Sequence, residues 1–180
     1  VYGRDNPVQR CRVHKVKNVI GYLPKDLQRQ TTMTMRAAWK LDPKEGLTRL
    51  RQHADGLERS HPKAAASLRE GLEETFTINR LGLPPTLRHG LASTNLIESS
   101  LSGVEHRTGR VTRWRSGEMA LRWAAAAALE TEKHFRKIMG HRELWMLKAA
   151  LDEGLPDIGV AGQLTTGEPM INVDSERLAA

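Results

Sequence analysis

Apolar side chains recur at helical spacing through the first half of this 180-residue chain, and no other feature restricts its fold more. From residue 14 onward they return every three or four positions, as the buried face of an α-helix requires. Prolines and short polar breaks divide the pattern into four predicted helices over 14–23, 25–39, 43–59 and 63–76. Aromatic residues are only 4% of the chain, which favours packed helices over a β-sandwich. We therefore expect a mainly α protein.

A different period precedes these helices. Residues Val8 to Val13 alternate between two faces, a pattern typical of one short β-strand, which would need a partner strand. After a break at Pro84-Pro85, the polar residues 93–95 predict the start of another helix, and Gly103 and Gly109 predict that it is short. An Ala-rich helix over about 117–139, capped by Ser116, and a last helix over about 142–153 follow. The remainder, 154–180, lacks periodicity and is expected to be a loosely ordered tail.

The charge balance favours a polyanionic partner. Lys and Arg number 28 against 21 Asp and Glu, a formal net charge of +7, which favours nucleic acid first and an acidic membrane surface second. One basic segment is interleaved with an indole and could follow phosphates while the ring stacks on a base; its residues are His106, Arg107, Arg110, Arg113, Trp114 and Arg115. The alternative for this segment is an ordinary solvated loop.

Cysteine content and hydropathy bear on the compartment. A single cysteine cannot form an internal disulfide, so we expect a reducing compartment, the cytoplasm. The longest strongly apolar stretch, 123–129, is far shorter than the roughly 20 residues of a membrane span. The sequence therefore predicts no membrane insertion.

Two places in the chain could carry chemistry. Cys11 and His14 have the spacing Cys-x-x-His, but zinc requires four ligands and the sequence offers no matching pair. We favour a small buried residue and a satisfied histidine at a junction, with a zinc-stabilised adaptor as the alternative. Glu98 is an isolated carboxylate in an uncharged run: it can complete a capping box with Asn95 as N-cap, or serve as a metal ligand, for which one Glu alone is insufficient.

Three segments in this order and separation resemble the bacterial mutator-type DDE transposases. The similar segments, within about residues 8–150, are Gln9–Val19 with its Cys-x-x-His, Ser93–Ser99 with its Glu, and Arg113–Trp123. The resemblance implies the C-terminal part of an RNase H-like α/β catalytic core that carries a helical insertion. On this basis residues 8–14 are the strand and the signature, 15–90 the helical insertion, 91–153 the C-terminal part of the core, and 154–180 the tail.

The same resemblance implies a function. The expected activity is DNA strand cleavage and transfer dependent on Mg²⁺ or Mn²⁺, with Glu98 as a catalytic metal ligand, Cys11 and His14 as the signature pair, and a homo-oligomer acting on transposon ends and target DNA. The two catalytic aspartates belong upstream of the signature and are absent from this sequence. The chain is therefore expected to be a fragment, inactive alone. The competing hypothesis is a noncatalytic helical module for DNA binding or oligomerisation.

Overall fold

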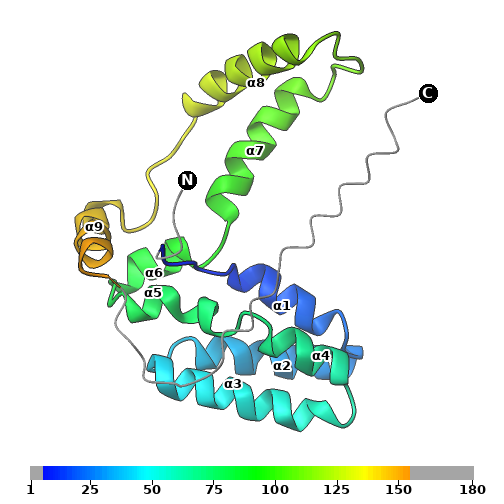
Figure 1. Ribbon diagram of the computed structural model, residues 1–180, viewed down its shortest axis with the longest axis vertical. Helices are drawn as coiled ribbons and strands as arrows, with labels where there is room; N and C mark the ends of the chain where they lie inside the picture. The colour runs from blue at the N-terminus through cyan, green and yellow to red at the C-terminus, as the bar shows by residue number, and fades with distance from the viewer. Residues whose placement is uncertain (1–5, 155–180) are drawn as a thin grey trace.

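The computed structural model describes residues 6–154, which form helices and no β-strand. The helices form a bundle, a central region and a protruding hairpin (Figure 1). The α-helices are α1 (Arg12–Ile20), α2 (Lys25–Ala38), α3 (Pro43–Glu58), α4 (Pro62–Arg69), α5 (Thr77–Arg80), α6 (Pro85–Leu91), α7 (Asn95–Thr108), α8 (Gly117–Glu132) and α9 (Leu144–Glu153), with 3₁₀ turns η1 (Glu73–Phe76) and η2 (His141–Glu143). The mainly α prediction is confirmed.

Helices α1 to α4 and η1 enclose the principal hydrophobic core. Fully buried side chains from each element meet there, including Val19, Met35, Leu50, Leu68 and Phe76. Local signals fix the first residues of α2 and α3 as predicted: α2 begins directly after Pro24, and the Asp42 carboxylate accepts a hydrogen bond from the Lys44 amide at 2.9 Å.

The single helix predicted over 63–76 is wrong, because the chain turns at Gly71. Gly71 has φ +55°, and a Cβ there would lie 2.7 Å from the Arg10 guanidinium. Only glycine combines this backbone conformation with room for the arginine. Helix α4 therefore ends at Arg69, and η1 resumes two residues after the turn.

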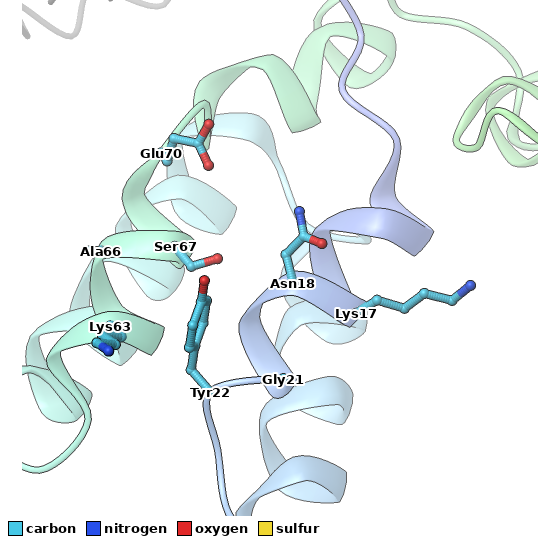
Figure 2. Close-up of a pocket in the computed structure, with 8 residues that line it drawn as sticks. All are labelled: Lys17, Asn18, Gly21, Tyr22, Lys63, Ala66, Ser67 and Glu70. Carbon is cyan, nitrogen blue, oxygen red and sulfur yellow. The ribbon is translucent and has the colours of Figure 1, made fainter. Parts of the chain in front are cut away.

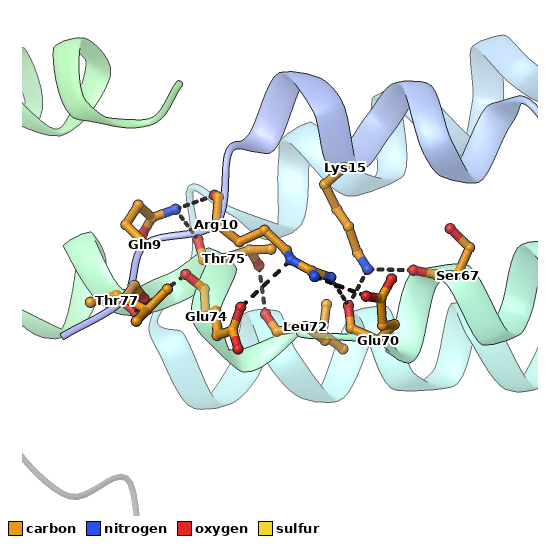
Figure 3. Close-up of polar contacts among 10 residues, drawn as sticks. Gln9, Arg10, Lys15, Ser67, Glu70, Leu72, Glu74, Thr75 and Thr77 are labelled. Carbon is orange, nitrogen blue, oxygen red and sulfur yellow. Dashed lines mark hydrogen bonds and ion pairs between the residues drawn. The ribbon is translucent and has the colours of Figure 1, made fainter. Parts of the chain in front are cut away.

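The strand predicted over Val8 to Val13 is also wrong. Residues up to Cys11 are irregular, and Arg12 already begins α1. The backbone amides of this segment bind carbonyls of η1 and of the end of α6 instead of a neighbouring strand: Arg10 N–H donates to Glu74 O at 3.0 Å and Arg12 N–H to Ala92 O at 2.9 Å. The alternating polar side chains likewise have specific partners, as Figure 3 shows for Arg10, which pairs with Glu70 at 2.8 Å.

Helices α7 and α8 form an antiparallel hairpin that extends away from the bundle (Figure 1). Gly109 ends α7 as its C-cap, as predicted, but the prediction that Gly103 shortens the helix is wrong. A Cβ at Gly103 would collide with the Thr131 side chain of α8, so this glycine allows close packing inside an uninterrupted helix. Ser116 caps α8 as predicted, accepting from Met119 N–H at 3.1 Å, but α8 ends at Glu132.

After α8 the chain returns toward α6. Gly140, at φ +75°, allows this approach, since a Cβ there would lie 2.7 Å from the Leu87 backbone. The Thr86 hydroxyl donates to Glu143 at 2.9 Å and ties the start of α9 to α6. Apart from Gly154, the predicted tail lies outside the described residues.

The two halves of the described chain differ in how much apolar surface they bury. Between residues 92 and 154 only Ala127 and Thr131 are buried. Large apolar side chains on these helices stay open, including Ile97 (63% exposed), Leu121 (69%) and Trp145 (69%). Large exposed apolar side chains in this number are typical of regions that meet another protein or domain. Within residues 6–154, no helix is both long and apolar enough to cross a membrane.

Candidate functional site

The structure brings Cys11, His14 and Glu98 together around Thr94. The Thr94 hydroxyl lies 3.4 Å from the Cys11 sulfur and 3.4 Å from His14 Nδ1, and it donates a hydrogen bond to Glu98 Oε1. His14 Nδ1 is 3.5 Å from the same carboxylate oxygen. Residues 80 or more positions apart in the sequence thus meet in one cluster, hereafter the Thr94 cluster (Cys11, His14, Thr94 and Glu98).

Local helix geometry places Glu98 in this cluster. Thr94 is the N-cap of α7, so the prediction of Asn95 as N-cap is wrong, and Glu98 is the fourth helical residue. Its amide donates to Thr94 O at 2.9 Å, the first full helical bond of α7. A capping box needs the acidic side chain one position earlier, where it can reach back to the N-cap amide. Glu98 instead turns toward Thr94 and His14.

The members of the Thr94 cluster differ in exposure. Cys11 is buried, whereas the side chains of His14 and Glu98 are each 48% exposed. Burial raises the pKa of the Cys11 thiol, but hydrogen bonds from the His14 backbone amide and from Thr94 outweigh it and lower the pKa to about 7. The Thr94 cluster therefore has a buried side, where the Cys11 thiol has a lowered pKa, and a solvent-exposed side, where the Glu98 carboxylate lies.

Glu98 can offer a hard cation one oxygen-bearing side chain. Within residues 6–154, no group of three or more His, Cys, Asp or Glu side chains is arranged to hold a metal ion. A Mg²⁺ site uses carboxylate oxygens, and two-metal phosphoryl transfer needs several carboxylates. The open Glu98 carboxylate fits one ligand position of such a site, and the described residues do not complete it.

The predicted DNA-binding residues lie at the other end of α7. The arginine loop, residues 109–116, connects α7 to α8 and lines a hollow of about 440 Å³ with the exposed side chains of Arg110, Arg113 and Arg115. Trp114 on this loop is 42% exposed. A rise of about 1.5 Å per residue places the loop roughly 15 Å along the axis from Glu98. Arg107 does not line this hollow. It lies in the last turn of α7, where its guanidinium donates to Gly103 O of the same helix at 2.9 Å.

A second hollow, of about 640 Å³, lies between α1 and α4, and none of the predicted site residues lines it. Figure 2 shows Tyr22 pointing across this gap toward Ser67. The structure also gives roles to residues that the sequence analysis did not single out. Thr94 is one. Arg12 is another: its guanidinium lies 5.2 Å from the Trp39 ring centroid and donates to Thr75 O at 2.7 Å.

Helix α1 anchors the Thr94 cluster in the bundle. Desolvation, followed by repulsion from Arg88, lowers the pKa of Arg12 to about 10, and the stacked guanidinium fixes the start of α1. Lys15, on the next turn, is 2% exposed and donates to the backbone carbonyls of Ser67 and Glu70 (Figure 3). Cys11 and His14 thus sit on a tightly held segment.

Comparison with known proteins gives the family. The profile described as "Transposase, Mutator family" matches residues 4–137. The chain is 26% identical over 151 residues to the transposase for insertion sequence element IST2 of Acidithiobacillus ferrooxidans, a match that covers 82% of this chain and 50% of the relative. It is 27% identical over 128 residues to the transposase for insertion sequence element ISRM5 of Rhizobium meliloti (strain 1021), covering 71% of this chain and 32% of the relative. No solved structure gives a significant match.

The chain thus spans half or less of the length of the curated relatives that it matches. The family match covers the Thr94 cluster and the arginine loop together. This chain belongs to the Mutator family of transposases.

Proposed function

We propose that this chain contributes Glu98 to a metal-dependent DNA strand cleavage and transfer site of an insertion-sequence transposase. The observation that carries the proposal is the position of Glu98. It lies on the first turn of α7, half-exposed and held beside the signature pair Cys11 and His14, in a chain whose family match includes all three. An oriented, open carboxylate is what a hard-cation ligand requires.

The remaining ligands would come from two aspartates outside this sequence, on an RNase H-like core that α7 and α8 would complete. Mg²⁺ or Mn²⁺, when bound, would activate the attacking oxygen and stabilise the leaving oxygen of the phosphodiester. Glu98 would supply one carboxylate. The contacts with Thr94 and His14 hold this carboxylate in place at the start of α7. On this proposal the isolated chain does not cleave DNA.

DNA is the expected partner of the arginine loop. Its three exposed guanidinium groups surround one hollow, and the exposed Trp114 ring lies among them in the sequence. Guanidinium forks bind phosphates without reading sequence, so this loop would hold the DNA backbone while other parts select transposon ends.

The test of the proposed function is Glu98→Gln in a full-length transposase that contains this chain. Cleavage of a transposon-end duplex should be lost while DNA binding persists, because the substitution removes the charge and keeps the side-chain size. Glu105→Gln is the matched control, since Glu105 is an exposed carboxylate two turns further along α7. Cleavage at the wild-type rate by Glu98→Gln would refute the metal-ligand role.

A second candidate is a noncatalytic module that binds DNA and a second copy of the chain. The observation in its favour is the exposed apolar surface of residues 92–154. This candidate predicts a concentration-dependent dimer of the 180-residue chain in sedimentation experiments, and it predicts DNA binding that is insensitive to Glu98→Gln. Full-length cleavage that depends on Glu98 would decide against it.

A further inference from the structure

Thr94 occupies the N-cap position of α7, yet its side chain does not cap the helix. A threonine at this position ordinarily accepts a hydrogen bond from a free amide of the first turn. Thr94 makes no such bond. Its hydroxyl faces the Glu98 carboxylate, the Cys11 sulfur and the His14 ring instead. The hydroxyl is therefore directed at the candidate site and not at the helix end.

The hydrogen-bonding capacities of the four groups determine how this hydroxyl is used. A hydroxyl has one hydrogen to donate and two lone pairs. An ionised carboxylate only accepts, and it is a stronger acceptor than sulfur, so the hydrogen of Thr94 goes to Glu98 Oε1. A lone pair of the same hydroxyl then faces His14 Nδ1 at 3.4 Å and can accept its hydrogen in the Nδ1–H tautomer. The hydroxyl thus links the imidazole to the carboxylate.

The backbone of Thr94 is itself fixed to the bundle. Its amide N–H donates to the Cys11 sulfur at 3.4 Å, and two residues earlier Ala92 O accepts from Arg12 N–H at 2.9 Å. Helix α7 contains no buried residue, so packing of its own side chains does little to fix the position of Glu98. The contacts through Thr94, together with the His14–Glu98 contact at 3.5 Å, connect the Glu98 side chain to the start of α1.

We propose that Thr94 is a positioning residue of the cleavage site, whose hydroxyl holds the Glu98 carboxylate in the orientation that binds the metal. The inference rests on the proposed function of Glu98 and adds a residue to it. Loss of the hydroxyl should leave Glu98 charged and present but free to rotate. The metal would then bind more weakly and cleavage would slow, while DNA affinity would not change.

The experiment compares Thr94→Val, which keeps the shape and removes the hydroxyl, with Thr94→Ser, which keeps the hydroxyl, in a full-length transposase that contains this chain. Thr94→Val should lower kcat for cleavage by about 10- to 100-fold, the range expected for one hydrogen bond to a charged group, with KM for DNA unchanged. Mn²⁺ binding followed by electron paramagnetic resonance without DNA should weaken in parallel. Thr94→Ser should restore both.

Ser93→Ala is the matched control, because the Ser93 hydroxyl lies in the same loop and contacts the Asn95 amide at 3.5 Å. It should leave kcat and Mn²⁺ binding unchanged. In the double variant Thr94→Val with Glu98→Gln, Mn²⁺ binding should be no weaker than with Glu98→Gln alone, since Thr94 acts through Glu98. If circular dichroism shows that Thr94→Val loses helix, Thr94→Ala replaces it, as alanine removes the hydroxyl without adding an apolar branch.

Two results would overturn the inference while the proposed function stands. One is wild-type kcat and Mn²⁺ affinity in Thr94→Val when Glu98→Gln is inactive. The other is an equal loss in Thr94→Val and Thr94→Ser, which would assign Thr94 a packing role only. Cleavage by Glu98→Gln would refute the proposed function itself, independently of Thr94.

Discussion

Lys15 should make the stability of this protein rise with pH. Its side chain is 2% exposed and donates to the carbonyls of Ser67 and Glu70. Desolvation, and next the nearby Arg10 charge, lower the pKa of Lys15 from 10.5 to about 8. Between these two values the unfolded chain holds a proton that the folded chain has released. The free energy of unfolding therefore increases as pH rises from about 8 to 10.5, and this increase is lost as pH falls again.

The magnitude follows from the size of the shift. At about 1.4 kcal/mol for each pH unit, Lys15 alone contributes up to about 3 kcal/mol between pH 8 and 10.5. Lys15→Met removes this titration and leaves the two carbonyls without their donor. The stability difference between the wild type and Lys15→Met should therefore widen by up to about 3 kcal/mol over this range.

Urea unfolding of the 180-residue chain, followed by circular dichroism at several pH values from 7.5 to 11, measures this difference. Lys17→Met is the matched control, because it makes the same substitution at an exposed position of the same helix. A Lys15→Met curve that runs parallel to the wild type would refute the conclusion that Lys15 titrates in a buried place.

Further predictions concern the arginine loop, Cys11 and the core. Replacing the three arginines of the arginine loop by Ala should weaken binding to all duplexes alike and reduce the slope of log affinity against log salt by up to about 0.9 per lost contact. Trp114→Ala should cost roughly 1–3 kcal/mol on frayed or single-stranded ends and little on blunt duplex; an equal loss on all forms with a lower melting temperature would instead indicate packing. Cys11→Ser should lower the melting temperature without releasing metal, and one zinc per chain lost in this variant would contradict it. Gly46→Ala should destabilise the bundle by a few kcal/mol in urea unfolding, since a Cβ there would lie 2.5 Å from both Ala38 O and the Phe76 ring; unchanged stability would contradict the packing.

The sequence predicts those elements whose boundaries depend on neighbouring residues. Pro24 before α2 and the pair Asp42-Pro43 at the start of α3 act within one turn, and both helices begin where predicted. The errors arise where a contact with a residue far away in the sequence determines the local structure. The polar alternation around Arg10 resembles a strand, but Arg10 pairs with Glu70, 60 residues away. Gly103 resembles a helix end, but it makes room for Thr131 of another helix.

For the candidate site, too, the sequence predicts single residues but not the contacts between distant ones. Motif resemblance selects Cys11, His14 and Glu98 one at a time, but it gives no distance between residues 80 positions apart. Thr94 could not be selected, because a threonine before a helix already has a sufficient local explanation as a cap. Only the three-dimensional contacts show that its hydroxyl serves Glu98 and not the helix amides.

The position of the Thr94 cluster also explains how a carboxylate can be held on a poorly buried helix. The bundle of α1 to α4 has its own core, whereas between residues 92 and 154 only Ala127 and Thr131 are buried. The cluster lies where these two parts meet, with Cys11 and His14 at the start of α1 and Thr94 and Glu98 at the start of α7. Because α1 is fixed by the buried Lys15 and the stacked Arg12, the bundle can set the place of Glu98 although α7 itself buries no residue. On the proposed function of Glu98, Lys15→Met should therefore weaken Mn²⁺ binding in the full-length transposase, as measured by electron paramagnetic resonance. Replacing exposed apolar side chains of α8 should leave Mn²⁺ binding unchanged.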